Sequence, residues 1–275
     1  MKRIFGIIGS PRKMGNCELL VKEIAAKLPD GPAELKMVRL VEKDIRPCRA
    51  CYRCLTEDCP IKDDFSRVMD AILTADGVIV SAPAYHHAPH SSLQRFLDRG
   101  LQFKRHLDVL SRKSAVAVAI AGSKDAEGYA LLGVENFIRS MGMILKESVL
   151  VHAALPGEVL LSADALASAT LLAASLFATA GPRRPAGPCC VGCGGTFFEF
   201  RGGNRIYCLS CGASGTVTTD AAETRIDTRQ PANPWRGVQE AKARGEWLKE
   251  MKARYLRDKE CLKTASASRE GGEFI

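Results

Sequence analysis

The sequence has no long hydrophobic run. Its longest uncharged apolar stretch, Ala165–Ala180, is 16 residues long, whereas a helix needs about 20 mostly apolar residues to cross a bilayer. The N-terminal segment Met1–Gly9 contains a short apolar run, but Pro11, Arg12 and Lys13 follow too soon for the core of a signal peptide. We therefore expect no membrane partner and a cytoplasmic protein.

The sequence also lacks the two commonest nucleotide-binding signatures at its first turn. After the apolar segment Arg3–Ile8 comes GSPRKMGN, which contains neither a Walker lysine motif nor the GxGxxG of dinucleotide folds. Such a turn, opening into a helix, presents free backbone amides that favour an anion. A mononucleotide phosphate fits it better than ATP or NAD. The residues of the turn suited to a phosphate are Ser10, Arg12, Lys13, Gly15 and Asn16.

The composition is that of a soluble globular protein, with 46% hydrophobic and 25% charged residues among 275. This length suits one core domain of ordinary size and a smaller appendage. The formal net charge is +8. Such a basic excess fits a nucleic acid, an anionic cofactor or an acidic protein partner, and does not choose among them.

The eleven cysteines are not spread as a disulfide framework would be. Nine of them lie in two tight groups, and such clustering in a chain without a secretory signal indicates metal ligation in a reducing compartment. Cys17 and Cys261 have no partner in the sequence and are expected to be free thiols. The two groups are Cys48, Cys51, Cys54 and Cys59, and then Cys189, Cys190, Cys193, Cys208 and Cys211.

Short apolar runs alternate with helical patterns through the first 150 residues, which is typical of parallel βαβ units. Five strands and four crossovers predict an open, doubly wound parallel sheet, and a fifth helix, Ala163–Ala180, closes this domain over residues 1–180. The expected strands are Arg3–Ile8, Leu35–Leu40, Gly77–Ser81, Ser114–Ala121 and Leu145–Val151. The expected helices between them are Asn16–Leu28, Asp64–Leu73, Ser91–Leu107 and Tyr129–Met141.

A second region begins after Gly181–Pro188, where three prolines and two glycines in eight residues forbid regular structure. Residues 189–219 are expected to form a small metal-binding ribbon with hairpin strands at Thr196–Phe200 and Arg205–Tyr207. A second linker, Ala221–Asn233, then leads to a charged helix over residues 234–263 and a loose tail from Thr264.

Three stretches resemble the NADPH-dependent FMN reductase superfamily: the GSPRxxGN turn, SAPAYH at Ser81–His86 and LQRFLDR at Leu93–Arg99. The first cysteine group is similar to that of the iron-sulfur flavoproteins within this superfamily. The resemblance implies a flavodoxin-like fold that binds FMN. It also implies that the electron donor is NAD(P)H or a ferredoxin, and that the chain assembles as a dimer or tetramer. Two features depart from the family pattern: Cys17 replaces Ser or Thr, and His86-His87 replace an aromatic residue or Gly.

The resemblance also implies which residues contact FMN. Pro83 supports the assignment, because proline fixes one backbone dihedral and removes a donor that would compete at the flavin's polar edge. His86, His87 and His90 can also be read as polar loop residues without a chemical role. The expected phosphate contacts are Ser10, Arg12, Gly15 and Asn16, with Lys13 and Cys17 beside them. The expected ring contacts are Pro83, Ala84, Tyr85 and His86 on one side and Ala121, Gly122, Ser123 and Gly128 on the other.

The first cysteine group is a C-x2-C-x2-C-x4-C run. Three thiolates at two-residue gaps can wrap one face of a compact cluster, and the longer last gap lets the fourth cysteine return to the same cluster. A single [4Fe-4S] cluster is the favoured interpretation, with a closed zinc site or no metal as alternatives. Arg46, Arg49 and Arg53 flank the run and are expected to stabilise the reduced cluster.

The second group contains two C-x2-C-G knuckles, a strong signal for a metal. Paired knuckles place four sulfurs at the corners of a tetrahedron. Zinc would make the site structural and iron would make it a rubredoxin-like electron carrier; zinc is favoured because the hairpin is short. The expected ligands are Cys190, Cys193, Cys208 and Cys211, with Cys189 as a less regular substitute for Cys190.

Two classes of function are compatible with these features. The first is an FMN-dependent oxidoreductase that passes electrons between NAD(P)H or ferredoxin, FMN and the cluster; its plainer variant is an NAD(P)H-dependent FMN or quinone reductase with structural zinc sites. The second is a redox-sensing nucleic-acid-binding protein, whose ribbon and basic C-terminal segment offer Trp235, Trp247 and Tyr255 among basic residues. Because acidic residues interleave with these bases, as on a solvated helix face, we expect no nucleic-acid partner.

Overall fold

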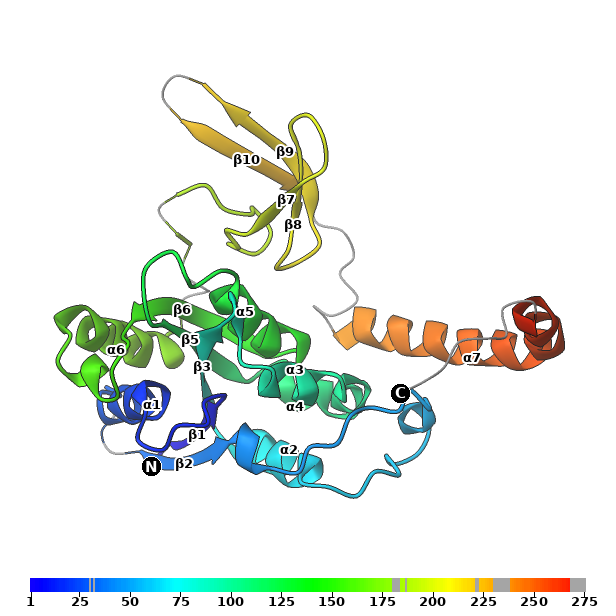
Figure 1. The fold of residues 1–275 in the computed structure, drawn as a ribbon, viewed down its shortest axis with the longest axis horizontal. Helices are drawn as coiled ribbons and strands as arrows, with labels where there is room; N and C mark the ends of the chain where they lie inside the picture. Colours follow the sequence, from blue (N-terminus) through cyan, green and yellow to red (C-terminus); the bar gives the residue numbers. More distant parts are fainter. Residues whose placement is uncertain are drawn as a thin grey trace.

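The computed structural model describes residues 1–29, 31, 33–179, 184–185, 187–220, 223–229 and 238–267. Its larger part is an open sheet of parallel strands with helices on both faces (Figure 1). The strand order β2-β1-β3-β5-β6 is that of the flavodoxin-like doubly wound fold, so the predicted fold class is confirmed. The strands are β1 (Arg3–Ile8), β2 (Glu34–Arg39), β3 (Gly77–Tyr85), β5 (Ser114–Ala121) and β6 (Ile144–His152).

The main helices are α1 (Asn16–Ala26), α2 (Phe65–Thr74), α5 (Ala130–Ser140) and α6 (Ala163–Leu176). The strands carry apolar side chains on both faces, because helices cover both sides of the sheet. In β1, Phe5 and Ile7 pack in the core that contains α2 and α5, whereas Ile4 and Ile8 pack in the core that contains α1 and α6. These two cores hold the carboxyl ends of the strands in a fixed arrangement.

One predicted helix is wrong. The segment Ser91–Leu107 forms α3 (Ser92–Leu97), a 3-10 segment η3 (Gly100–His106) and a short α4 (Leu107–Leu110). Glycine is a poor residue for a helix interior, and Gly100 stands where the α-helix gives way to the 3-10 segment. Immediately before it, Arg99 is buried, with its guanidinium over the ring of Phe65.

Strand β3 is longer than predicted, because its last residues form a hairpin. Ala84 and Tyr85 pair antiparallel with the two-residue strand β4 (Ala88–Pro89), which the sequence analysis missed. The remaining short elements are η1 (Leu40–Glu42), η2 (Arg53–Leu55) and η4 (Glu158–Leu160).

The cysteine-rich ribbon is an antiparallel sheet in the order β10-β9-β8-β7. The expected linker Ala221–Asn233 is wrong over residues 224–229, because Thr224–Arg229 pairs with the strand before it along its whole length. The alternating β-branched residues Thr224, Ile226 and Thr228 are the signal that indicates a strand there. The strands are β7 (Phe198–Phe200), β8 (Arg205–Cys208), β9 (Ser214–Thr219) and β10 (Thr224–Arg229).

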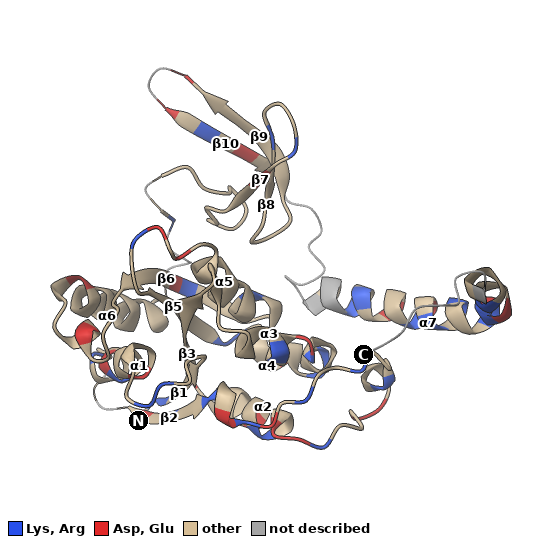
Figure 2. Ribbon diagram, in the orientation of Figure 1, with Lys and Arg blue, Asp and Glu red and all other residues tan. Residues whose placement is uncertain are grey.

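The last described element is the helix α7 (Val238–Ala267), which projects from the body of the molecule near η3 (Figure 1). The expected start at residue 234 lies outside the described residues, and the tail expected from Thr264 is helical as far as Ala267. Basic and acidic residues mix along this helix (Figure 2), as in the ion pair of Arg254 with Asp258. Among the described helices, none combines the length and the apolar character that crossing a bilayer requires.

Candidate functional site

A cavity lies at the carboxyl ends of β1, β3, β5 and β6, the edge at which open α/β sheets bind their ligands. Three of its lining residues, Ile120, Ala153 and Ala154, were not selected from the sequence. The last two directly follow β6, and applying the strand-end rule to that strand would have found them. The expected flavin contacts in the lining are Ser10, Arg12, Asn16, Cys17, Pro83, Ala84, Tyr85 and Gly122. The expected contacts outside it are Lys13, Gly15, His86, Ala121, Ser123 and Gly128.

The turn after β1 has the geometry of an anion site. Helix α1 begins after Gly15 without a side-chain cap, so amides of its first turn are available to a ligand. The turn is tight because Gly15 N donates to Arg12 O at 3.4 Å. A Cβ at position 15 would lie 2.9 Å from Arg12 Cβ. The helix dipole and Arg12 add positive potential, so these residues fit the phosphate of FMN.

Asn16 connects two loops through its side-chain amide. Its Nδ2 donates to Ala153 O at 3.2 Å, and its Oδ1 accepts from Gly157 N at 2.9 Å. Both polar groups of the side chain are therefore engaged across the cavity, with the loop after β6. Asn16 thus helps to shape the cavity that it lines, and its contact with the FMN phosphate stays a prediction.

Cys17 lines the cavity as a buried thiol. Burial raises the pKa of Cys17 to about 12, although the neighbouring Ser81 hydroxyl lowers it. In contrast, Cys261 is exposed on α7. The two cysteines that the sequence leaves without partners are thus in opposite environments.

We expect Cys17 to resist alkylation at pH 8 while Cys261 reacts. The shift of the Cys17 pKa from 9.0 to about 12 lowers the thiolate fraction about a thousandfold, and the thiolate is the nucleophile. Timed iodoacetamide labelling followed by peptide mass spectrometry measures both residues in one sample. Equal labelling rates for the two residues would contradict the buried environment.

The β3–β4 hairpin presents a two-histidine turn beside the cavity. His86 and His87 both have left-handed backbones, with φ of 49° and 63°, as a tight two-residue hairpin requires. The loop after β5 packs on this turn: Tyr129 N donates to His87 O at 2.7 Å, and a Cβ on Gly128 would collide with His87. Gly128 thus positions the turn.

His90 has a structural contact of its own. Its Nδ1 accepts from Ser92 N at 3.1 Å at the start of α3. Burial, followed by the charge of Arg95, lowers the pKa of His90. A neutral ring whose Nδ1 accepts a backbone N–H matches the reading of His90 as a loop residue without a chemical role.

The first cysteine group lies on a loop between β2 and α2. Ala50 and Tyr52, between the cysteines, adopt left-handed backbones, and Ala50 N donates to Cys48 Sγ at 3.4 Å. Burial and then the charges of the other three thiols raise the pKa of Cys54, so all four lie within electrostatic range. A cavity of about 480 Å³ adjoins Cys54 and Cys59. Cys54 and Cys59 therefore adjoin space for a bulky group, whereas Cys48 and Cys51 are not part of the cavity lining.

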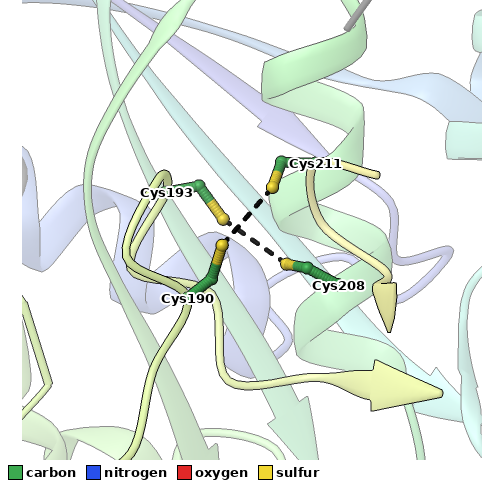
Figure 3. A group of neighbouring side chains, drawn as sticks. All are labelled: Cys190, Cys193, Cys208 and Cys211. Carbon is green, nitrogen blue, oxygen red and sulfur yellow. Dashed lines mark hydrogen bonds between the residues drawn. The ribbon is translucent and has the colours of Figure 1, made fainter. Parts of the chain in front are cut away.

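The two cysteine groups differ in how closely their sulfurs approach. In the described part of the chain, only the ribbon thiols converge within 4.8 Å of one another as a metal-binding set (Figure 3). The Cys190–Cys211 and Cys193–Cys208 sulfurs are 3.5 and 3.6 Å apart, close to the roughly 3.8 Å edge of a tetrahedron with 2.3 Å zinc–sulfur bonds. The four thiols of the Cys48–Cys59 loop do not form such a set in the described part of the chain.

Backbone and hydroxyl donors surround the ribbon thiols. Gly195 N donates to Cys193 Sγ at 3.2 Å. The buried Thr228 Oγ1 accepts from Val191 N at 3.0 Å and lies 3.2 Å from Cys190 Sγ, to which its own proton is free to donate. Thr228 lies on β10, which the sequence analysis treated as a linker, so this contact could not be predicted.

A doubly wound sheet with a cavity at its strand ends is the arrangement of a flavodoxin-like flavin oxidoreductase. Residues 2–155 match the NADPH-dependent FMN reductase family, and the chain belongs to this family, in its iron-sulfur flavoprotein branch. It is 30% identical over 145 residues to an iron-sulfur flavoprotein of Methanosarcina thermophila, covering 52% of this chain and 76% of that protein. An iron-sulfur flavoprotein of Methanocaldococcus jannaschii matches equally, over 75% of its length.

The family match ends before the ribbon. A solved structure of a flavone reductase, however, resembles the chain from end to end, with a TM-score of 0.72, 17% identity and coverage of 99% of both chains. At this identity the likeness concerns the fold. The ribbon and α7 are therefore part of an arrangement that another protein shares.

Proposed function

We propose that this FMN oxidoreductase is an electron-transfer protein that works as a homo-oligomer and passes electrons between NAD(P)H or ferredoxin, FMN and a [4Fe-4S] cluster on the Cys48–Cys59 loop. One observation carries the proposal. A flavin cavity occurs in the same domain as four thiols that share one loop and do not converge as the ribbon thiols do. FMN exchanges one or two electrons and such a cluster exchanges one, so together they connect two-electron and one-electron partners.

The residues of the chain bind and orient these groups. Ser10, Arg12 and the first-turn amides of α1 would hold the phosphate. Pro83, Ala84 and Tyr85 line the part of the cavity that suits the flavin ring. The large hydrophobic core beneath keeps these loops in place, so the protein supplies position and potential while the cofactors supply the redox chemistry.

We propose zinc in the ribbon. Its four sulfurs have the spacing of a closed tetrahedral site with no open position for a substrate, which is the arrangement of structural zinc. The ribbon hairpin is also short, with three residues in β7 and four in β8. The metal then maintains the fold of the ribbon and takes no part in electron transfer.

The test is one anaerobic preparation analysed for flavin, iron and zinc. We expect about one FMN, four iron and one zinc per chain, and flavin bands over a broad absorbance near about 400 nm that dithionite bleaches. NADPH and reduced ferredoxin are then mixed separately with the oxidised protein, and the faster reductant identifies the donor class. A preparation with FMN, two zinc and no iron even after anaerobic reconstitution would instead show a plain FMN or quinone reductase with structural zinc sites.

A further inference from the structure

A buried ion pair lies directly under the cysteine loop. Arg99, between α3 and η3, has a side chain that is 2% exposed, and that of Asp63 is 1% exposed. Arg99 Nη1 donates to Asp63 Oδ2 at 2.5 Å. The guanidinium also lies 4.7 Å from the centre of the Phe65 ring. Burying two charges is costly, and an apolar pair of similar volume is often at least as stable, so this pair is of interest for its geometry.

The pair joins the two ends of the loop. On the N-terminal side, Arg46 donates its N–H to Asp63 Oδ2 at 2.9 Å, and Arg46 O accepts from Arg99 Nη1 at 3.1 Å. On the C-terminal side, Asp63 Oδ1 accepts from Phe65 N at 3.1 Å. Arg99 and Asp63 thus close the base of the loop from which all four cysteines extend.

The same guanidinium contacts a thiol of the loop. Arg99 Nη2 donates to Cys59 Sγ at 3.4 Å. When the side-chain amide of Gln102 is oriented with its oxygen toward Arg99, this oxygen accepts from Arg99 Nε at 3.2 Å. Every nitrogen of the guanidinium therefore has a partner, and one partner is a sulfur. The flanking Arg53, in contrast, is exposed and paired with Glu57.

We propose that Arg99 is a positioning residue for the cluster: it fixes the position of Cys59, closes the base of the loop, and donates a hydrogen bond to the Cys59 thiolate. A buried cation with an N–H···S bond favours the reduced, more negative cluster and so raises its reduction potential. The inference rests on the cluster proposed above. Under this proposal, the residue that most affects the reduction potential of the cluster is Arg99, 40 positions away from Cys59, and not one of the flanking arginines.

Arginine is needed here for its shape as well as its charge. Its planar fork donates in fixed directions, whereas lysine offers one compact ammonium on a flexible stem. A lysine at position 99 keeps the positive charge but cannot serve Asp63, Arg46 O and Cys59 together. Comparing Arg99→Lys with Arg99→Gln therefore separates the geometry from the charge.

The experiment uses the reconstituted full chain and four variants: Arg99→Lys, Arg99→Gln, and the matched controls Arg95→Lys and Arg95→Gln. Arg95 is exposed on α3, one turn before Arg99. The readouts are FMN content, iron content and the midpoint potential from a redox titration followed by electron paramagnetic resonance. For Arg99→Gln we expect at least a tenfold smaller equilibrium constant for cluster reduction, which is about 59 mV more negative, with a smaller shift for Arg99→Lys. The Arg95 variants should match the wild type.

Each outcome decides the question. Variants of Arg99 that keep FMN but fail to take up iron support the positioning role, because the flavin shows that the domain is folded. Wild-type potentials in both loaded variants overturn the proposal, as does loss of FMN together with iron in both, which would give Arg99 a general folding role. If the wild type itself takes up no iron, the proposed function fails rather than this inference.

Discussion

Replacing Cys208 by serine is expected to unfold the ribbon and leave the flavin domain intact. The buried cluster of the ribbon consists of three cysteines and Ala213, with Cys193 and Phe198 packed against it, and the buried Ile206 adds one further apolar side chain. So small an apolar core cannot stabilise a four-stranded sheet alone, and a structural zinc site contributes about 10–16 kcal/mol at pH 7. Zinc content should fall by about one per chain, and amide hydrogen exchange should become fast in β7 to β10 only.

Cys189→Ser is the matched control for this experiment. Cys189 is adjacent to Cys190 and half-buried, but it does not belong to the converging set of sulfurs. The control should keep its zinc and its slow exchange. Slow exchange in the Cys208→Ser ribbon would show that the sheet does not depend on a metal.

Valine in place of Gly15 is expected to weaken FMN binding at least about a hundredfold, or about 2.8 kcal/mol. The new Cβ would lie 2.9 Å from Arg12 Cβ and 3.2 Å from Arg12 O, so the turn must open and move its amides away from the phosphate. Titration of the FMN-free protein with FMN, followed by quenching of flavin fluorescence, measures the affinity.

Gly187→Val serves as the control, because a Cβ at that position meets no atom within 4 Å. Its affinity for FMN should equal that of the wild type. Unchanged binding in Gly15→Val would mean that the phosphate is held somewhere other than at this turn.

The sheet could be predicted because each strand is a local pattern. Parallel strands buried on both faces appear as short continuous apolar runs, and β1 and β5 lie within the predicted bounds. The end of β3 could not be found in this way. Ala84 and Tyr85 are strand residues only because β4 folds back on them.

The candidate site, like the sheet, could be predicted only where the contacts are local in the sequence. The cysteine spacing predicted the ribbon set, because each knuckle is formed by neighbouring residues. The roles of Arg99 and Thr228 depend on partners 40 and 38 positions away. No periodicity or spacing in the sequence reports such contacts, so only the folded chain reveals them.

The side chain of Asn16 is hydrogen-bonded to the backbone of Ala153 and Gly157, which follow it by 137 and 141 positions in the sequence. The two walls of the flavin cavity are therefore joined before any cofactor arrives. Folding, rather than binding, carries the entropic cost of ordering them, so FMN meets a preorganised site. Asn16 therefore contributes to the affinity for FMN through the order that it gives the empty cavity.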